Sequence, residues 1–372
     1  MTRHAISLGR IAGIDIRLDY SWFLIIVLLS WMLARSYYPA EMKGGSLAQY
    51  WVMGVVTAIL LFVSVLLHEL GHSLVARRYK VGVRSITLFI FGGVSDIKTE
   101  PPSAGAEFWI ALAGPLTSFV LAGLFALLQP AVGAVAPLAA VAKYLAFING
   151  MLGVFNLVPG FPLDGGRVFR AIVRGVTHDL RQATVIAGNV GRVIAFLFIV
   201  LGVWRMLGGD VANGLWIAFI GWFLESAAVT QIQQQVIRGS LAGHPVSEAM
   251  ERDYAEIPAG VTLRQLVHEH VLGKGQRSFI VRAGDDVAGL LTLHRIKETP
   301  RAVWPTTTAR QAMIPIAQTK RVRPSAELWA TLEAMDRDGV NQLPVMEDGR
   351  MLGMLTREGI ISYLRTRREL GV

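Results

Sequence analysis

The sequence contains no cysteine among its 372 residues. This absence excludes disulfides, zinc–thiolate sites and thiol catalysis, so any metal site must use His, Asp or Glu side chains. Charged residues are also scarce, at 17% of the chain, whereas a soluble globular protein has about 25%. Since 53% of the residues are hydrophobic, the composition argues against a soluble enzyme or a disordered regulator and places part of the chain in lipid.

Acidic residues are fewer than basic residues, and most of this difference arises in the hydrophobic part of the chain. Residues 1–240 hold 18 Lys and Arg against 11 Asp and Glu, and residues 241–372 hold 18 against 16. A basic excess beside apolar segments suits loops that face an anionic membrane surface. We therefore expect a lipid bilayer as a partner, and no nucleic acid. Segment 1–19 lacks the apolar core and cleavage site of a signal peptide, so the first apolar run is expected to stay as an anchor.

Six apolar runs approach the length of about 20 residues that a membrane-spanning helix needs. They are residues 18–35, 51–76, 106–128, 137–158, 184–207 and 211–230. Basic residues follow the second and fourth runs, whereas the segment 129–138 between the third and fourth has none. By the positive-inside rule, the N-terminus and the C-terminal part of the chain are expected to be cytoplasmic. The sequence thus predicts a multi-pass protein of the cell (inner, cytoplasmic) membrane.

The last third of the chain carries an internal repeat. "SEAM" at 247–250 recurs as "RQAM" at 310–313, and "GLLTLHRI" at 289–296 recurs as "GMLTREGI" at 353–360. The starting positions differ by 63 (310 − 247) and 64 (353 − 289) residues, which is typical of a structural repeat. We predict a membrane domain at 1–230, a Gln-rich linker at 231–243, and two mixed α/β repeats at 244–300 and 305–367.

The second apolar run contains the motif "HELGH" at 68–72. His68 and His72 are four residues apart, so they lie on one face of a helix about one turn from each other. Both imidazoles can then bind one Zn²⁺, and Glu69 lies beside it as a general base toward water. The alternative is a pair of structural histidines, with Glu69 paired to an arginine. Because charged residues are rare within membrane spans, the metal interpretation is favoured.

A third metal ligand is expected from "NLVPGFPLDGG" at 156–166. Prolines and glycines break the helix here, and irregular backbone at membrane depth is tolerated only where protein or a water-filled cavity covers it. Such backbone can aim the carboxylate of Asp164 at the metal. The amide of Asn156 is placed to donate a hydrogen bond to a developing oxyanion. The alternative is that Asp164 is an ordinary turn aspartate before two glycines.

Together these motifs resemble the site-2 protease family of intramembrane zinc metalloproteases, of the type with six spans and C-terminal CBS domains. "LAGPL" at 112–116 is similar to a segment of the family's third span, although Thr117 and Ser118 stand where the family often has Asn. The resemblance implies cleavage within or near a transmembrane segment of a membrane-anchored regulator. It implies His68, His72 and Asp164 as ligands of one Zn²⁺ per chain, Glu69 as general base and Asn156 as oxyanion stabiliser.

The C-terminal repeats resemble paired CBS domains, which commonly bind adenine nucleotides such as ATP or AMP. Ribose-binding repeats of this kind often end in T-x-x-D. Here Thr356 is followed at the third position by Gly359, and Thr292 by Arg295, so the aspartate is missing from both. Two interpretations stay open: a nucleotide-binding regulatory unit, or a structural module that pairs two chains into a homodimer.

The segment "SITLFIFGGVSDI" at 85–97 is rich in β-branched and aromatic residues around Gly92-Gly93, which predicts a hairpin. Either the edge of this hairpin pairs with an unwound substrate segment, or the hairpin is only a structural loop.

Two rival functions are a non-catalytic scaffold with a degenerate site and a transporter or channel gated by the CBS repeats. Polar residues cluster at one site rather than along a pathway, which favours the protease. The predicted fold is a six-span α-helical membrane domain with a small hairpin, followed by an α/β CBS pair.

Overall fold

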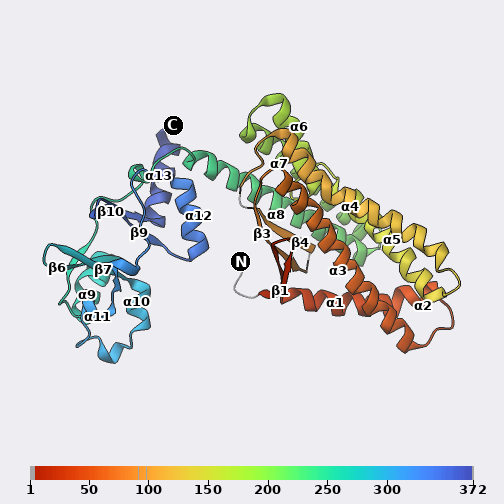
Figure 1. The fold of residues 1–372 in the computed structure, drawn as a ribbon, viewed down its shortest axis with the longest axis horizontal. Helices are drawn as coiled ribbons and strands as arrows, with labels where there is room; N and C mark the ends of the chain where they lie inside the picture. Colours follow the sequence, from red (N-terminus) through yellow and green to blue (C-terminus); the bar gives the residue numbers. More distant parts are fainter. Residues whose placement is uncertain (1–4, 91, 98, 371–372) are drawn as a thin grey trace. The chain divides into compact units, whose positions relative to one another are not determined.

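The computed structural model describes residues 5–90, 92–97 and 99–370 of the chain. These residues form two compact units, which divide between Gln235 and Val236. The first unit consists of long helices with a small sheet, and the second of short strands and helices (Figure 1).

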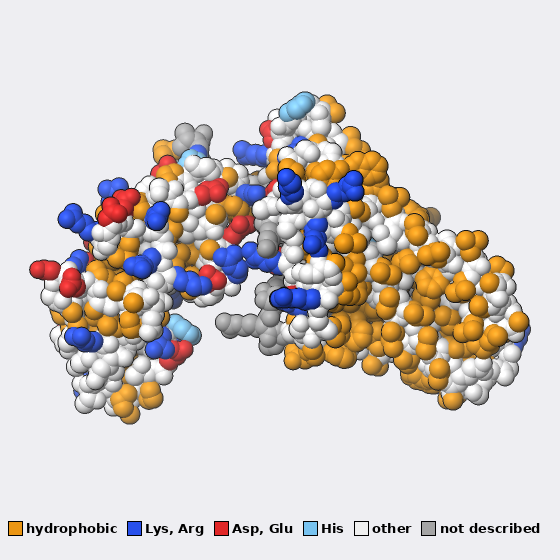
Figure 2. All heavy atoms as spheres, in the orientation of Figure 1, with side chains coloured by type: hydrophobic (Ala, Val, Ile, Leu, Met, Phe, Trp, Pro, Cys, Tyr) orange, Lys and Arg blue, Asp and Glu red, His pale blue; other side chains and the backbone are white. Residues whose placement is uncertain are grey.

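In the described part of the chain, six helices are long and apolar enough to cross a membrane. The first spans Ser21–Glu41 and comprises α1 (Ser21–Met32), a π-helical turn (Leu33–Tyr37) and α2 (Tyr38–Glu41); the others are α3 (Leu47–Arg78), α4 (Ala104–Ala131), α5 (Ala136–Asn156), α7 (Leu180–Leu207) and α8 (Val211–Leu241). Hydrophobic side chains cover the broad face of this unit (Figure 2), as contact with lipid requires. The prediction of six spans is confirmed. Helix α8 continues through most of 231–243, so the segment predicted as a linker is largely helical.

A short turn separates α5 from α6 (Asp164–Thr177), and α6 begins at Asp164 itself. A side chain at Gly165 would overlap the carbonyl of Leu157, and a Cβ at Gly166 would lie 2.5 Å from the amide nitrogen of Phe161. The two glycines therefore let the first turn of α6 pack directly on the turn that precedes it. This is the helix break that the prolines and glycines predicted.

The sheet of the first unit has four strands in the order β1-β2-β3-β4: β1 (Ala5–Ile11), β2 (Ile14–Asp19), β3 (Val83–Phe89) and β4 (Gly92–Ile97). Strands β2 and β3 are parallel, and the other pairs are antiparallel. The predicted hairpin is confirmed, but Gly92 and Gly93 pair with Phe89 and Leu88 at the start of β4 rather than forming its turn. The two N-terminal strands were not predicted, although the alternating buried residues of β2 are a strand signal.

The inner face of this sheet packs on α3, the helix that carries the HELGH motif. Ile14, Ile16 and Leu18 of β2 lie with Ile86 and Leu88 of β3 in one buried cluster. The same cluster contains Phe62 of α3, which precedes the motif, and Leu70, which belongs to it. The sheet therefore holds the helix from one side, and α4 packs on it from another.

Among the described residues, the second unit contains two sheets and three buried clusters. One sheet has the order β5-β6-β7-β8, formed by β5 (Glu256–Pro258), β6 (Ser278–Ala283), β7 (Asp286–Thr292) and β8 (Ile314–Pro315); β9 (Gln342–Glu347) and β10 (Arg350–Thr356) form the other. The helices are α9 (Leu263–Leu266), α10 (Leu293–Glu298), α11 (Ala309–Ala312), α12 (Leu328–Asp338) and α13 (Arg357–Leu370). Strands β6 and β9 begin 64 residues apart (342 − 278), as do β7 and β10 (350 − 286), which matches the sequence repeat.

The two repeats exchange their opening segments. The amide of Val246 donates to the carbonyl of Ala326, and the amide of Ala309 donates to the carbonyl of Val261, both at 2.8 Å. Val246 is buried in a core with residues of the second repeat, whereas Ala309 is buried in the core of the first. The packing units therefore differ from the sequence repeats 244–300 and 305–367, because the first turn of each repeat packs in the core of the other repeat.

Candidate metal centre

Three polar side chains from two helices converge inside the first unit. The Nε2 atoms of His68 and His72 each lie 3.1 Å from Oδ2 of Asp164, and they are 3.3 Å from each other. One potential ligand atom of each residue lies within 4.8 Å of the others. Both histidines are only 4% exposed. The structure thus brings together the three residues that the sequence singled out as ligands.

The centre lies close to one end of α3. His72 is six residues before Arg78, where the helix ends, which corresponds to roughly 9 Å at 1.5 Å per residue. Arg77 and Arg78 are basic residues in the last turn of the same helix. The three side chains therefore lie near the basic end of a membrane-spanning helix.

The second ring nitrogen of each imidazole, Nδ1, has a hydrogen-bond partner on α4. Nδ1 of His72 lies 2.7 Å from the carbonyl oxygen of Ile110, and Nδ1 of His68 lies 2.8 Å from Oγ of Ser118. Because a carbonyl can only accept, Nδ1 of His72 carries the hydrogen, and Nε2 of the neutral ring keeps its lone pair. Such a partner on the second nitrogen is typical of histidines that bind metals.

This arrangement fits a divalent cation. Two imidazole nitrogens and a carboxylate oxygen face each other, and their lone pairs repel wherever no proton or metal ion lies between them. Two nitrogens and one oxygen, with a position left for water, are the donor set of a catalytic zinc.

Gly114 on α4 leaves room for the two imidazoles. A Cβ at this position would lie 2.6 Å from Nε2 of His68 and closer still to Nε2 of His72. On the facing helix, a Cβ at Gly71 would lie 2.5 Å from Oγ1 of Thr117. Helices α3 and α4 therefore approach through small residues, as is common in membrane bundles. The sequence pointed to "LAGPL" only as a family segment, without this reason.

The two residues that depart from the family pattern have different contacts. Ser118 meets His68, as described, whereas the hydroxyl of Thr117 donates to the carbonyl of Ala113 at 2.8 Å within its own helix. Ser118 is fully buried. A hydroxyl in an apolar span, one turn after Gly114, was the available signal for this role, but the sequence could not say which of the two residues would be used.

Strand β4 lies against Glu69. The hydroxyl of Ser95 donates to Oε2 of Glu69 at 2.7 Å, and a Cβ at Gly93 would lie 2.5 Å from Cγ of Glu69. In the described sheet β4 is an outermost strand. Pairing of its edge with a substrate segment stays a prediction, and proline substitutions at Phe89 or Ile90 that left cleavage intact would contradict it.

Asn156 is the last residue of α5, and its amide has a partner within the same helix. Its amide nitrogen donates to the carbonyl of Leu152 at 3.0 Å, within its own helix. The amide has a second N–H, which this bond does not use. Its role therefore stays a prediction.

Comparisons of the chain with known proteins identify its relatives. The sequence profile of Peptidase family M50 matches residues 56–138 and 129–200, and that of the CBS domain matches residues 299–366. A Mycobacterium tuberculosis protein, provisionally named zinc metalloprotease Rip3, is 35% identical over 95% of this chain and 91% of its own length. A Synechocystis protein with the same provisional description, sll0528, is 32% identical over 97% of this chain and 96% of its own length. The solved site-2 protease of Methanocaldococcus jannaschii is 28% identical over 62% of this chain and 95% of its own, with a TM-score of 0.42.

Proposed function

Because this chain belongs to peptidase family M50, the site-2 proteases, and is a multi-pass zinc metalloprotease with C-terminal CBS domains, we propose that it cleaves peptide bonds within or near a transmembrane segment. The observation that carries this proposal is the convergence of His68, His72 and Asp164 beside a membrane-spanning helix. A peptide must enter the membrane region to reach a site at this depth. The substrate is therefore a membrane-anchored protein, and we assign it to the class of membrane-bound regulators.

The residues of the site have distinct roles in this proposal. His68, His72 and Asp164 hold one zinc ion per chain, and when bound it supplies the Lewis acidity that activates water and polarises the scissile carbonyl. Glu69 takes a proton from the attacking water and passes it to the departing amide nitrogen. Asn156 donates an amide N–H to the oxyanion.

Metal removal tests the proposal. We expect a zinc chelator to abolish cleavage of a single-span substrate by the purified chain, and one equivalent of zinc to restore it. Metal content and cleavage are measured on the same samples. A scaffold with a degenerate site, or a transporter gated by CBS domains, cuts nothing in either state. Cleavage that survives complete loss of metal would refute the zinc mechanism.

The orientation in the membrane is a second part of the proposal. Basic residues flank the end of α3, whereas the turn between α4 and α5 has none, so we infer that the N-terminus and the CBS domains are cytoplasmic in the cell membrane. The native chain has no cysteine, so single introduced cysteines can be labelled selectively. In intact cells, an impermeant maleimide is expected to label Val135→Cys and to spare Leu272→Cys, both at exposed positions. The reverse pattern would overturn the orientation.

We also propose that the CBS domains bind ATP or AMP and thereby regulate cleavage. The hydroxyl of Thr356 is already engaged, since it donates to Glu251 and accepts from the amide of Gly359. A nucleotide must therefore compete for it or bind without it. Calorimetric titration of the full chain in detergent is expected to show heat with one of the two nucleotides. No heat at millimolar ligand, together with a dimeric mass by light scattering, would instead support a structural dimerisation module.

A further inference from the structure

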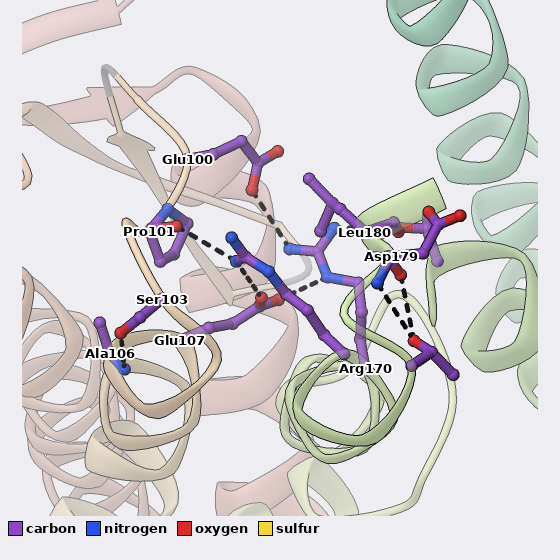
Figure 3. A network of polar contacts seen from close by, with 11 residues as sticks. Glu100, Pro101, Ser103, Ala106, Glu107, Arg170, Asp179 and Leu180 are labelled. Atoms are coloured by element: carbon purple, nitrogen blue, oxygen red, sulfur yellow. Dashed lines mark hydrogen bonds and ion pairs between the residues drawn. The ribbon is translucent and has the colours of Figure 1, made fainter. Parts of the chain in front are cut away.

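A buried ion cluster joins α4 to α6 beside the metal centre (Figure 3). Glu107, in the first turn of α4, is completely buried and accepts hydrogen bonds from Nε of Arg170 and, at 3.3 Å, from Arg174. Glu100 lies at the rim, 3.4 Å from Arg170. We call Glu100, Glu107, Arg170 and Arg174 the Glu107 cluster. Figure 3 shows the guanidinium of Arg170 between the two glutamates, which approach it from different sides.

A contribution to folding stability does not by itself explain the Glu107 cluster. Removing charges from water is costly, and a buried ion pair is often replaceable by apolar side chains without loss of stability. Arg170 is only 7% exposed, so its desolvation is nearly complete. Charges kept at such a place in a membrane domain point to a function.

The positions of Glu107 and Arg170 along their helices connect them to the metal ligands. Glu107 is three residues, or one turn, before Ile110, whose carbonyl orients His72. Arg170 is six residues after Asp164 on α6. One ion pair therefore joins the helix that orients a histidine ligand to the helix that begins with the carboxylate ligand.

Arg170 also holds the turn that leads into Asp164. Its guanidinium lies over the ring of Phe161, 5.4 Å from the centroid, three residues before Asp164. It further lies 3.5 Å from the hydroxyl of Thr184 on α7. The side chain thus contacts both the turn before Asp164 and the helix that follows α6, which a purely apolar side chain could not do with fixed geometry.

We propose that Glu107 and Arg170 are positioning residues of the metal centre, which set the separation of α4 and α6 at which Asp164 meets both imidazoles. Their role presupposes the zinc site proposed above. Partners that orient metal ligands typically contribute about 10- to 100-fold to metal affinity. The same range is expected here, because a shift of α6 moves the carboxylate away from the histidines.

The test measures zinc affinity directly, by chelator competition on the full chain in detergent. We expect Glu107→Gln to weaken zinc binding by about 10- to 100-fold and to alter the visible spectrum of the cobalt-substituted protein. Arg170→Lys keeps the positive charge but loses the fork of donors, so an intermediate loss is expected. Arg181→Gln, at an exposed position on α7, is the control and is expected to bind zinc like the wild type.

Thermal unfolding of the metal-free proteins separates positioning from stability. A lower melting temperature with unchanged zinc affinity and an unchanged cobalt spectrum would overturn the proposal. If Glu107→Gln fails to fold, Arg170→Lys decides in the same way, because it preserves the charge balance. His68→Ala serves as the reference. If it binds zinc as well as the wild type does, the proposed metal centre is wrong. If His68→Ala loses zinc while Glu107→Gln and Arg170→Lys keep it, only the positioning role is refuted.

Discussion

Replacing Glu69 with glutamine is expected to slow substrate cleavage by about 100- to 10,000-fold, the usual contribution of a general base. Glutamine has the same shape and still accepts the hydrogen bond from Ser95, but it cannot take a proton from water. Because Glu69 is not one of the three converging ligands, the variant is expected to keep one zinc ion per chain. This variant should therefore keep its zinc content while its cleavage rate falls.

The measurement follows cleavage of a single-span substrate in vesicles, with metal content determined on the same preparation. Glu225→Gln is a suitable control, because Glu225 also lies in a membrane-spanning helix and forms an ion pair with Arg192 at 3.4 Å. We expect this control to cleave at the wild-type rate. Wild-type cleavage by Glu69→Gln would refute catalysis by this glutamate.

A single methyl group at Gly114 is expected to abolish the metal centre. The added Cβ would lie within 2.6 Å of the Nε2 atoms of both histidines, the atoms that bind zinc in this proposal. Neither ring can retreat without giving up its bond to Ser118 or to the carbonyl of Ile110. We expect the zinc content of Gly114→Ala to fall from one ion per chain toward zero, with loss of cleavage.

The matched control lies on the same helix. A Cβ at Gly123 meets no atom within 4 Å, and replacing a helical glycine with alanine generally favours the helix by about 1 kcal/mol. Gly123→Ala is therefore expected to keep its zinc and to cleave normally. If Gly114→Ala also kept one zinc per chain, the packing of α4 against the histidines would be wrong.

Much of the site could be predicted because it depends on local patterns. The pairing of His68 with His72 follows from the helical repeat, and the spans follow from the length that lipid demands. The N-terminal strands were missed, although the alternation of Ile14, Ile16 and Leu18 with polar residues is a strand signal. The role of Asn156 stays a prediction, because it concerns a substrate atom, and the amide donates one hydrogen bond within its own helix.

The amino-acid sequence by itself determined the residue types of the site, their spacing on one helix and the apolar segments that enclose them. Periodicity and hydrophobicity act over a few turns, so they are readable without a fold. The tertiary structure alone decided that Asp164 reaches two histidines more than 90 residues away, that a main-chain carbonyl at Ile110 orients one of them, and that Gly114 is all that fits between. The motif at 156–166 indicated Asp164 as a ligand, but these contacts depend on packing between distant helices, and any residue can supply a carbonyl.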